Sequence, residues 1–88
     1  MTLVSAHGEE LLLARRGDEF FVLDSVCSHA LGYLDQGTLV GCEIECPLHD
    51  GRFDLRTGRA TRDPAVDPIR AYQVRVEGTA ILVGPAKS

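Results

Sequence analysis

Two cysteine–histidine pairs constrain this sequence more than any other feature. The first pair reads Cys27-Ser28-His29, and the second reads Cys46-Pro47-Leu48-His49. Each pair lies in a segment that we expect to be a loop, so each loop can turn one thiolate and one imidazole toward a common centre at little cost in loop entropy. The pattern therefore predicts a metal site with two sulfur and two nitrogen ligands.

Length and composition favour one small soluble domain. At 88 residues the chain is near the size at which a hydrophobic core alone gives marginal stability and a bound metal helps. Hydrophobic residues make up 44% and charged residues 25% of the chain, as in globular rather than disordered proteins. Since no repeat or linker interrupts the sequence, we expect a single domain over residues 1–88, with the metal-binding part at about 25–68.

The charge pattern and the N-terminus argue against several classes of protein. A net charge of −4 disfavours general affinity for nucleic acid, and no apolar run is long enough to span a bilayer. No basic region precedes an apolar run, and Glu9 and Glu10 come early, so we expect no signal peptide. Three cysteines without an export signal indicate the reducing cytoplasm, where thiols bind metals rather than form disulfides. We also expect a monomer in solution.

Short apolar segments bounded by turn residues predict an all-β fold. Alternation is clearest in the tail, where Tyr72, Val74 and Val76 are separated by polar residues. The predicted strands are residues 1–5, 10–15, 20–24, 38–40, 43–46, 52–55, 59–61, 72–77 and 79–83. Two prolines make residues 62–68 an extended loop. Many short strands separated by turns predict a sandwich or a small barrel without a helix.

One segment is also compatible with a helix. Residues 9–16 contain Leu11, Leu12 and Leu13, which are good helix formers. The segment is short, however, and Gly17-Asp18 is a turn signal, so a β-hairpin with residues 20–24 is favoured.

The ligand pattern leaves two kinds of metal centre open. Zinc accepts two cysteines and two histidines in tetrahedral geometry, although zinc sites usually pair cysteine with cysteine and histidine with histidine. Here each loop carries one of each, which suits a two-iron cluster with both thiolates on one iron and both imidazoles on the other. An all-cysteine cluster needs four thiolates, and the chain has three cysteines.

The motif and the residues that follow it resemble a known family. Cys-x-His and Cys-x-x-His, followed by Asp50-Gly51-Arg52-Phe53-Asp54 and Thr57-Gly58, are similar to the Rieske [2Fe–2S] ferredoxins of bacterial aromatic-ring dioxygenase systems. The similarity covers about residues 20–83. It implies one [2Fe–2S] cluster, held by Cys27 and Cys46 at the buried iron and by His29 and His49 at the outer iron.

The resemblance also implies an architecture. Proteins of this family have a Rieske-type fold of three small antiparallel sheets, with a two-loop cluster-binding tip. They usually carry a further strand before the position of Met1, which puts the packing of the first sheet in question.

The function that the resemblance implies is electron transfer rather than catalysis. Such ferredoxins pass single electrons from an NAD(P)H-dependent flavoprotein reductase to a terminal ring-hydroxylating oxygenase in aromatic hydrocarbon catabolism. A mononuclear oxygenase iron would need two further histidines and a carboxylate, and only His7 remains. Two alternatives stay open, a small Rieske subunit of another oxidoreductase such as nitrite reductase and a structural zinc module.

Two further pairs of positions indicate a low reduction potential. High-potential relatives place a serine and a tyrosine hydroxyl two and four residues after the second histidine, where this chain has Gly51 and Phe53. They also join their loops with a disulfide at the positions of Gly32 and Leu48. Fewer hydrogen-bond donors stabilise the reduced, more negative cluster less. We therefore expect a carrier at the low end of the Rieske range.

The remaining candidate residues are given simpler roles. Cys42 is predicted to be a small apolar filler and His7 a surface residue. The acidic side chains near the loops are predicted to be solvated, with steering toward a basic partner as the alternative. Tyr33 and Leu48, with Leu31 and Pro64, are expected to cover the cluster and to leave an apolar docking patch.

Overall fold

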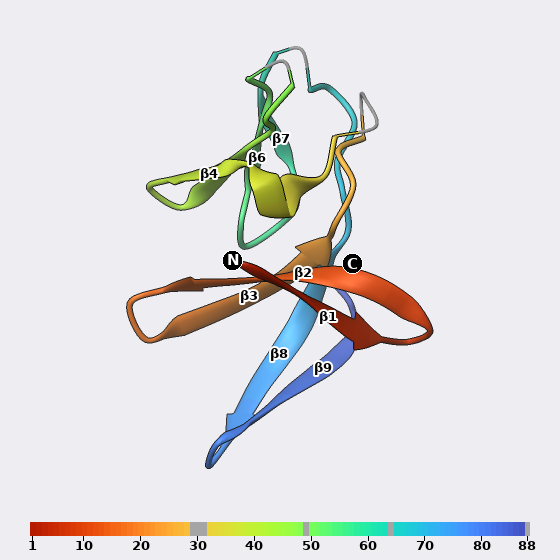
Figure 1. The fold of residues 1–88 in the computed structure, drawn as a ribbon, viewed down its shortest axis with the longest axis vertical. Helices are drawn as coiled ribbons and strands as arrows, with labels where there is room; N and C mark the ends of the chain where they lie inside the picture. Colours follow the sequence, from red (N-terminus) through yellow and green to blue (C-terminus); the bar gives the residue numbers. More distant parts are fainter. Residues whose placement is uncertain (29–31, 49, 64, 88) are drawn as a thin grey trace.

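Two antiparallel sheets lie at opposite ends of an elongated molecule (Figure 1). The computed structural model describes residues 1–28, 32–48, 50–63 and 65–87. In chain order the elements are β1 (Thr2–Ala6), β2 (Glu9–Arg16), β3 (Glu19–Asp24), the 3₁₀ helix η1 (Leu34–Gln36), β4 (Thr38–Val40), β5 (Glu43–Glu45), β6 (Arg52–Asp54), β7 (Ala60–Arg62), β8 (Ala71–Glu77) and β9 (Ala80–Ala86). The all-β prediction is confirmed, and no helix among the described residues is long and apolar enough to cross a membrane.

The larger sheet has the strand order β1-β2-β3-β8-β9. Residues 9–16 form strand β2, so the predicted hairpin is confirmed and the helical alternative is wrong. The hairpin turns at Gly17, whose φ of +61° is a conformation that glycine adopts without a steric penalty. The local turn signal therefore outweighs the helix propensity of the leucines.

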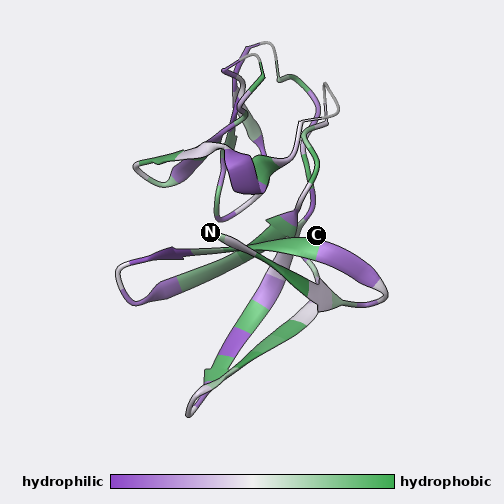
Figure 2. Ribbon diagram, in the orientation of Figure 1, coloured by the Kyte–Doolittle hydropathy of each residue, from purple (hydrophilic) through white to green (hydrophobic). Residues whose placement is uncertain are grey.

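Strand β2 is buried on both faces, which explains its run of leucines. Leu12 and Ala14 belong to the main core, whereas Leu11 belongs to a second cluster with Val22 and Tyr72 on the opposite face. Because successive side chains of a strand point to opposite faces, a strand covered on both sides carries a continuous apolar run. Strand β8 is exposed over much of its length and shows the usual alternation of polar and apolar residues (Figure 2).

The described residues form two sheets rather than the three that the family resemblance implies. The first and last hairpins belong to one sheet because β3 pairs with β8 through Val22–Tyr72 and Leu23–Ala71. This pairing joins residues that are about fifty positions apart, so no local sequence pattern predicts it.

The last strand is longer than expected. Gly84 and Pro85 look like strand breakers, yet β9 continues to Ala86, which pairs with Tyr72. Since β9 lies at the edge of the sheet, a proline that cannot donate a ladder hydrogen bond is tolerated there.

The smaller sheet consists of four three-residue strands in the order β4-β5-β6-β7. Ile44 and Phe53 pair across β5 and β6, and both side chains are fully buried. They share the main core with Leu12 and Leu23 of the larger sheet. One continuous hydrophobic core therefore joins the two ends of the molecule.

A close backbone contact holds the turn after β6 against the segment that leads into β8. Gly58 has a φ of +78°, and a Cβ atom on it would lie 2.0 Å from the carbonyl oxygen of Ile69. The Ile69 N–H donates a hydrogen bond to the Gly58 carbonyl at 2.9 Å. Only a residue without a side chain permits this approach.

We predict that Gly58→Ala destabilises the protein by about 3 kcal/mol or more, because it combines a left-handed backbone conformation with a backbone clash. The matched control is Gly78→Ala, which has a φ of +60° but no atom within 4 Å of the added methyl group. That control should cost about 1 kcal/mol. Denaturant unfolding measures both free energies, and equal losses would contradict the contact at Gly58.

Candidate metal centre

The two predicted ligand loops close in the same way. The Cys27 N–H donates to the Gly32 carbonyl at 2.9 Å, and the Cys46 N–H donates to the Gly51 carbonyl at 2.7 Å. In both loops the cysteine enters a hairpin that a glycine closes five positions later. This repeated Cys-x₄-Gly pattern is visible in the sequence and is a signal of loop closure that the ligand spacing alone does not give.

Each loop is also anchored at its base. In the first loop, the Leu34 N–H donates to the Ser25 carbonyl at 2.8 Å, and Val26 and Tyr33 form an isolated β-bridge. In the second loop, the pairing of Glu45 with Arg52 continues the hairpin of β5 and β6. The bases of both loops are therefore held by hydrogen bonds and strand pairing.

The second loop reverses direction through an unusual backbone conformation. Asp50 has a φ of +61°, in the left-handed region that aspartate tolerates better than most residues. The next residue, Gly51, is buried and accepts the hydrogen bond from Cys46. The Asp-Gly sequence thus supplies the turn that brings the chain back into β6.

The two loops lie against each other at the cysteines. A Cβ atom built on Gly32 of the first loop would lie 2.9 Å from the Cys46 Sγ atom and 3.3 Å from the Leu48 side chain in the second loop. The convergence of the loops, which was inferred from the spacing of their ligands, is therefore present in the fold. The contact of Gly32 with Leu48 also matches the place where high-potential relatives are expected to carry a disulfide.

Both candidate cysteine ligands are buried in the main core. Cys27 is 4% exposed and Cys46 is fully buried, and they share this core with Leu34, Ile44 and Phe53. A thiolate in such apolar surroundings is costly unless a cation compensates its charge. Two buried thiols in one core therefore fit the sulfur side of a metal centre.

The two candidate histidine ligands, His29 and His49, lie outside the described residues. Among the residues that are described, no group of three or more potential ligands comes together. Sequence position nevertheless confines each histidine to a loop that starts at a cysteine and closes at a glycine, residues 27–32 and 46–51. The assignment of the four ligands stays a prediction.

A third segment, residues 65–69, packs beside the cysteines. Ala65 and Ile69 are buried in the same core as Cys27 and Cys46. The Ser28 hydroxyl of the first loop donates to the Asp67 carbonyl at 2.6 Å. An extended loop was predicted here, with Asp67 as a solvated charge, but the packing of Ala65 and Ile69 was not predicted because two separate apolar residues in a loop give no periodic signal.

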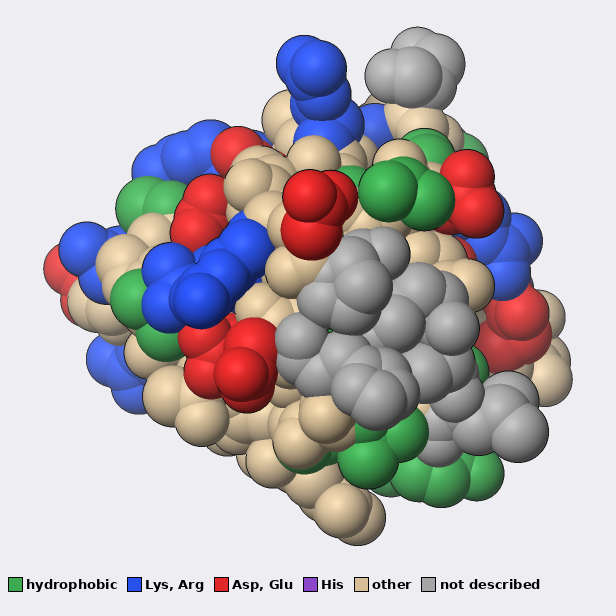
Figure 3. Space-filling view, turned by 90° about the horizontal axis from the view of Figure 1, so that it is seen from above, with side chains coloured by type: hydrophobic (Ala, Val, Ile, Leu, Met, Phe, Trp, Pro, Cys, Tyr) green, Lys and Arg blue, Asp and Glu red, His purple; other side chains and the backbone are tan. Residues whose placement is uncertain are grey.

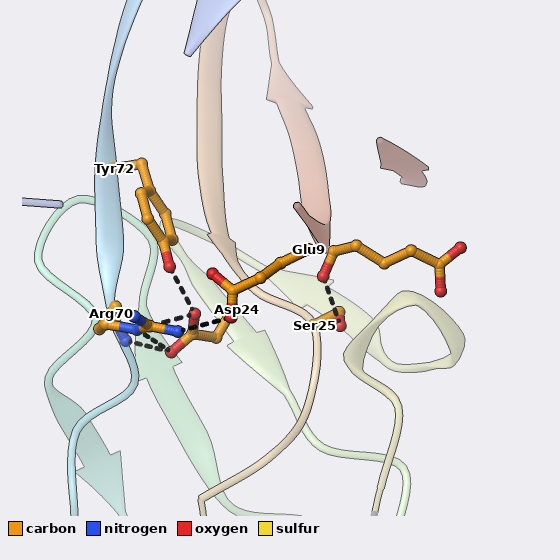
Figure 4. Close-up of polar contacts among 6 residues, drawn as sticks. Glu9, Asp24, Ser25, Arg70 and Tyr72 are labelled. Carbon is orange, nitrogen blue, oxygen red and sulfur yellow. Dashed lines mark hydrogen bonds and ion pairs between the residues drawn. The ribbon is translucent and has the colours of Figure 1, made fainter. Parts of the chain in front are cut away.

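A polar cluster fixes the point where the first loop leaves the larger sheet (Figure 4). The Asp24 carboxylate accepts hydrogen bonds from the Tyr72 hydroxyl at 2.9 Å and from the Arg70 backbone N–H at 2.9 Å. The Arg70 side chain also reaches Asp24 and Glu9. In the opposite direction, the Asp24 N–H donates to the Arg70 carbonyl at 2.9 Å. Hydrogen bonds thus connect the end of β3 to the residue that precedes β8, at the place where the chain passes between the two sheets.

The surface around the loops carries both apolar and charged groups. Tyr33 is 57% exposed and Leu48 is 54% exposed, so both are accessible for the predicted docking patch, whereas Leu31 and Pro64 lie outside the described residues. Hydrophobic and acidic side chains both reach the surface at this end of the molecule (Figure 3). Asp50, Asp63 and Asp67 are exposed, as the prediction of solvated loop charges requires, whereas Asp35, which was predicted to be solvated as well, is half-buried.

Cys42 and His7 lie away from the buried cysteines. Cys42 is half-buried in the turn between β4 and β5, beside the Arg56 guanidinium, and does not belong to the main core. His7 is exposed, as predicted, and its ring contacts the Gly84 carbonyl at 2.9 Å. Neither residue is positioned as a ligand of this centre.

The sequence matches the family model described as the Rieske [2Fe–2S] domain over residues 1–73. It is 41% identical over 80 residues to the ferredoxin component of the naphthalene 1,2-dioxygenase system of Pseudomonas aeruginosa, an alignment that covers 91% of this chain and 77% of the relative. It is 44% identical over 77 residues to the ferredoxin component of the p-cumate 2,3-dioxygenase system of Pseudomonas putida, covering 86% of this chain and 65% of the relative.

Solved structures show the same relationship. The ferredoxin of carbazole 1,9a-dioxygenase from Nocardioides aromaticivorans IC177 is 50% identical, with a TM-score of 0.91 over 96% of this chain and 83% of that chain. A chain in a complex of reduced oxygenase and oxidised ferredoxin in carbazole 1,9a-dioxygenase is 34% identical, with a TM-score of 0.89 over 99% of this chain and 82% of that chain.

We predict that Cys27→Ser or Cys46→Ser abolishes metal binding and lowers the melting temperature markedly, because the centre holds the two loops together. Cys42→Ala is the control and should keep its iron and colour. Iron analysis and thermal unfolding test the three variants. Normal iron content with a cooperative wild-type melt in either serine variant would refute the assignment of the two ligands.

The polar cluster at Asp24 predicts an alkaline loss of stability. Burial, with a further contribution from the hydrogen bond to Asp24, raises the pKa of Tyr72 to about 12. The folded protein therefore retains this proton above pH 10, where an unfolded tyrosine ionises, so the contribution is complete below pH 10 and is lost between 10 and about 12. Wild-type unfolding free energy should fall more steeply over this range than that of Tyr72→Phe. Parallel curves for the two proteins would contradict the assignment.

Proposed function

This chain belongs to the Rieske [2Fe–2S] family, and from that premise we propose that it carries single electrons from an NAD(P)H-dependent flavoprotein reductase to a terminal ring-hydroxylating oxygenase. The relatives that it matches are ferredoxin components of dioxygenase systems, which makes it an electron carrier rather than a catalytic enzyme. The observation that carries the proposal is the pair of buried cysteines in two adjacent loops of a Rieske fold.

We propose Cys27 and Cys46 as the ligands of the inner iron and His29 and His49 as the ligands of the outer iron. The bound cluster would supply reversible uptake of one electron. Support for the cysteine half comes from the burial of both side chains and from the matching hydrogen bonds that close the loops. Support for the histidine half comes from their positions within the two closed loops.

The protein's own residues would shield one side of the centre and leave the other accessible. The core residues Leu34, Ile44 and Phe53 keep water from the cysteine side. Tyr33 and Leu48 remain exposed on the adjoining loops, where a partner can contact them. Because electron transfer between proteins requires a short path, this arrangement favours docking at the loop end of the molecule.

The low potential that the sequence indicates is supported by the surroundings of Cys46. Phe53 places a fully buried phenyl ring where high-potential relatives are expected to have a tyrosine hydroxyl. Gly51 offers its carbonyl, an acceptor, to the Cys46 N–H. Gly51 has no side chain and the Phe53 ring has no hydroxyl. Neither residue can therefore donate a side-chain hydrogen bond that would stabilise the more negative, reduced state.

The partners follow from the relatives. One solved structure with a similar chain is a complex of reduced oxygenase and oxidised ferredoxin, which supports an oxygenase as the acceptor. We propose a flavoprotein reductase as the donor, a monomeric carrier and a cytoplasmic location. The ferredoxin components matched here favour this role over that of a small subunit of nitrite reductase.

We predict that the purified protein is red-brown, contains iron and acid-labile sulfide in equal amounts and shows no zinc. Its midpoint potential should lie near the negative end of the Rieske range, about −150 mV. Metal analysis and voltammetry test these outcomes, and reduction by a flavoprotein reductase with NADH tests the proposed donor. A colourless zinc protein would overturn the cluster assignment, and a potential near the positive end would contradict the roles given to Gly51 and Phe53.

A further inference from the structure

The segment of residues 65–69 is fixed at its two ends and exposed in the middle. Ala65 and Ile69 are buried in the main core beside the cysteines, whereas Val66 is 72% exposed and Asp67 and Pro68 are also exposed. The Ala65 N–H donates to the Arg62 carbonyl at 3.2 Å. At the other end, the Ile69 N–H donates a hydrogen bond to the Gly58 carbonyl. The middle of the segment therefore lacks the packing that holds its ends.

One hydrogen bond reaches this middle part from within the described residues. The Ser28 hydroxyl donates to the Asp67 carbonyl at 2.6 Å, across 39 positions of the sequence. Ser28 lies directly between Cys27 and His29 in the first loop. Its side chain thus joins the first ligand loop to the third segment that packs beside the cysteines.

The same two stretches of chain are also tied together nearer the larger sheet. There the Asp24 N–H donates to the Arg70 carbonyl, and the Arg70 N–H donates to the Asp24 carboxylate, both at 2.9 Å. Residues 24–28 and 67–70 are therefore connected at both ends. The Asp24 connection lies at the base of the first loop, whereas the Ser28 hydrogen bond joins the two stretches beside Cys27.

We propose that Ser28 is a positioning residue that fastens the 65–69 segment to the start of the first ligand loop and so restricts access of solvent and small molecules to the metal centre. This inference rests on the proposed function and concerns a residue that is not itself a ligand. Its physical basis is loop order, since a side-chain hydrogen bond at the unsupported part of two neighbouring loops limits their separation.

The chain offers a matched control in the same loop. The Ser25 hydroxyl also donates to a backbone carbonyl, that of Glu10, at 3.1 Å. This bond joins the base of the loop to β2 in the larger sheet rather than to the 65–69 segment. Ser25→Ala therefore removes the same kind of interaction without releasing that segment.

The test uses the cluster-loaded protein and its Ser28→Ala, Ser28→Thr and Ser25→Ala variants. Iron and sulfide are first measured in each, so that failure of the proposed function would be seen in the wild type itself. The variants are then mixed with excess iron chelator, and the loss of visible absorbance is followed with time. The free energy of unfolding is measured in parallel by denaturant titration.

We expect Ser28→Ala to lose its cluster about three- to tenfold faster than the wild type, as the loss of one net hydrogen bond allows. Ser28→Thr retains the hydroxyl at an exposed position and should restore the wild-type rate within about twofold. Ser25→Ala should lower stability without accelerating cluster loss. A wild-type rate in Ser28→Ala, no rescue by threonine, or equal acceleration in Ser25→Ala would each overturn the proposal.

Discussion

The burial of two cysteines in a core shared by both sheets is the constraint on which the rest of this structure depends. Cys27 and Cys46 come from separate loops, yet both lie among the side chains that join the larger sheet to the smaller one. Their positions require each loop to close tightly, which the hydrogen bonds to Gly32 and Gly51 accomplish. The fold therefore places the two proposed sulfur ligands in one core.

The larger sheet supports this arrangement because both of its faces are used. Leu12 and Ala14 of β2 pack in the main core on one face of the sheet, while Leu11 packs on the opposite face with Val22 and Tyr72. A chain of this length has few residues with which to build a core, so the use of both faces of one strand is economical. The smaller sheet can then consist of strands only three residues long.

Much of the local structure was predictable from sequence, whereas long-range pairing was not. Gly17-Asp18 indicated the hairpin of β2 and β3 correctly, and the Cys-His pairs located the loops that converge. The pairing of β3 with β8 was missed because the two strands are distant in sequence. The end of β9 was misplaced because Pro85 breaks an internal strand but is tolerated at an edge. The segment of residues 65–69 was undervalued because ordinary side chains and a backbone carbonyl carry its contacts.

The pairing of β3 with β8 has a consequence for how such a domain can change. Since these strands are neighbours, residues 25–70 form a single excursion that leaves and re-enters the sheet at adjacent positions. Two hydrogen bonds mark its two ends, one from the Asp24 N–H to the Arg70 carbonyl and one from the Arg70 N–H to the Asp24 carboxylate. An insert with closely spaced ends can be transplanted between other antiparallel strand pairs without rerouting the host chain. Residues 25–70 thus follow the chain path of a transferable insert, but the core that they share with Leu12 and Leu23 requires the facing side chains of the larger sheet to change together with them.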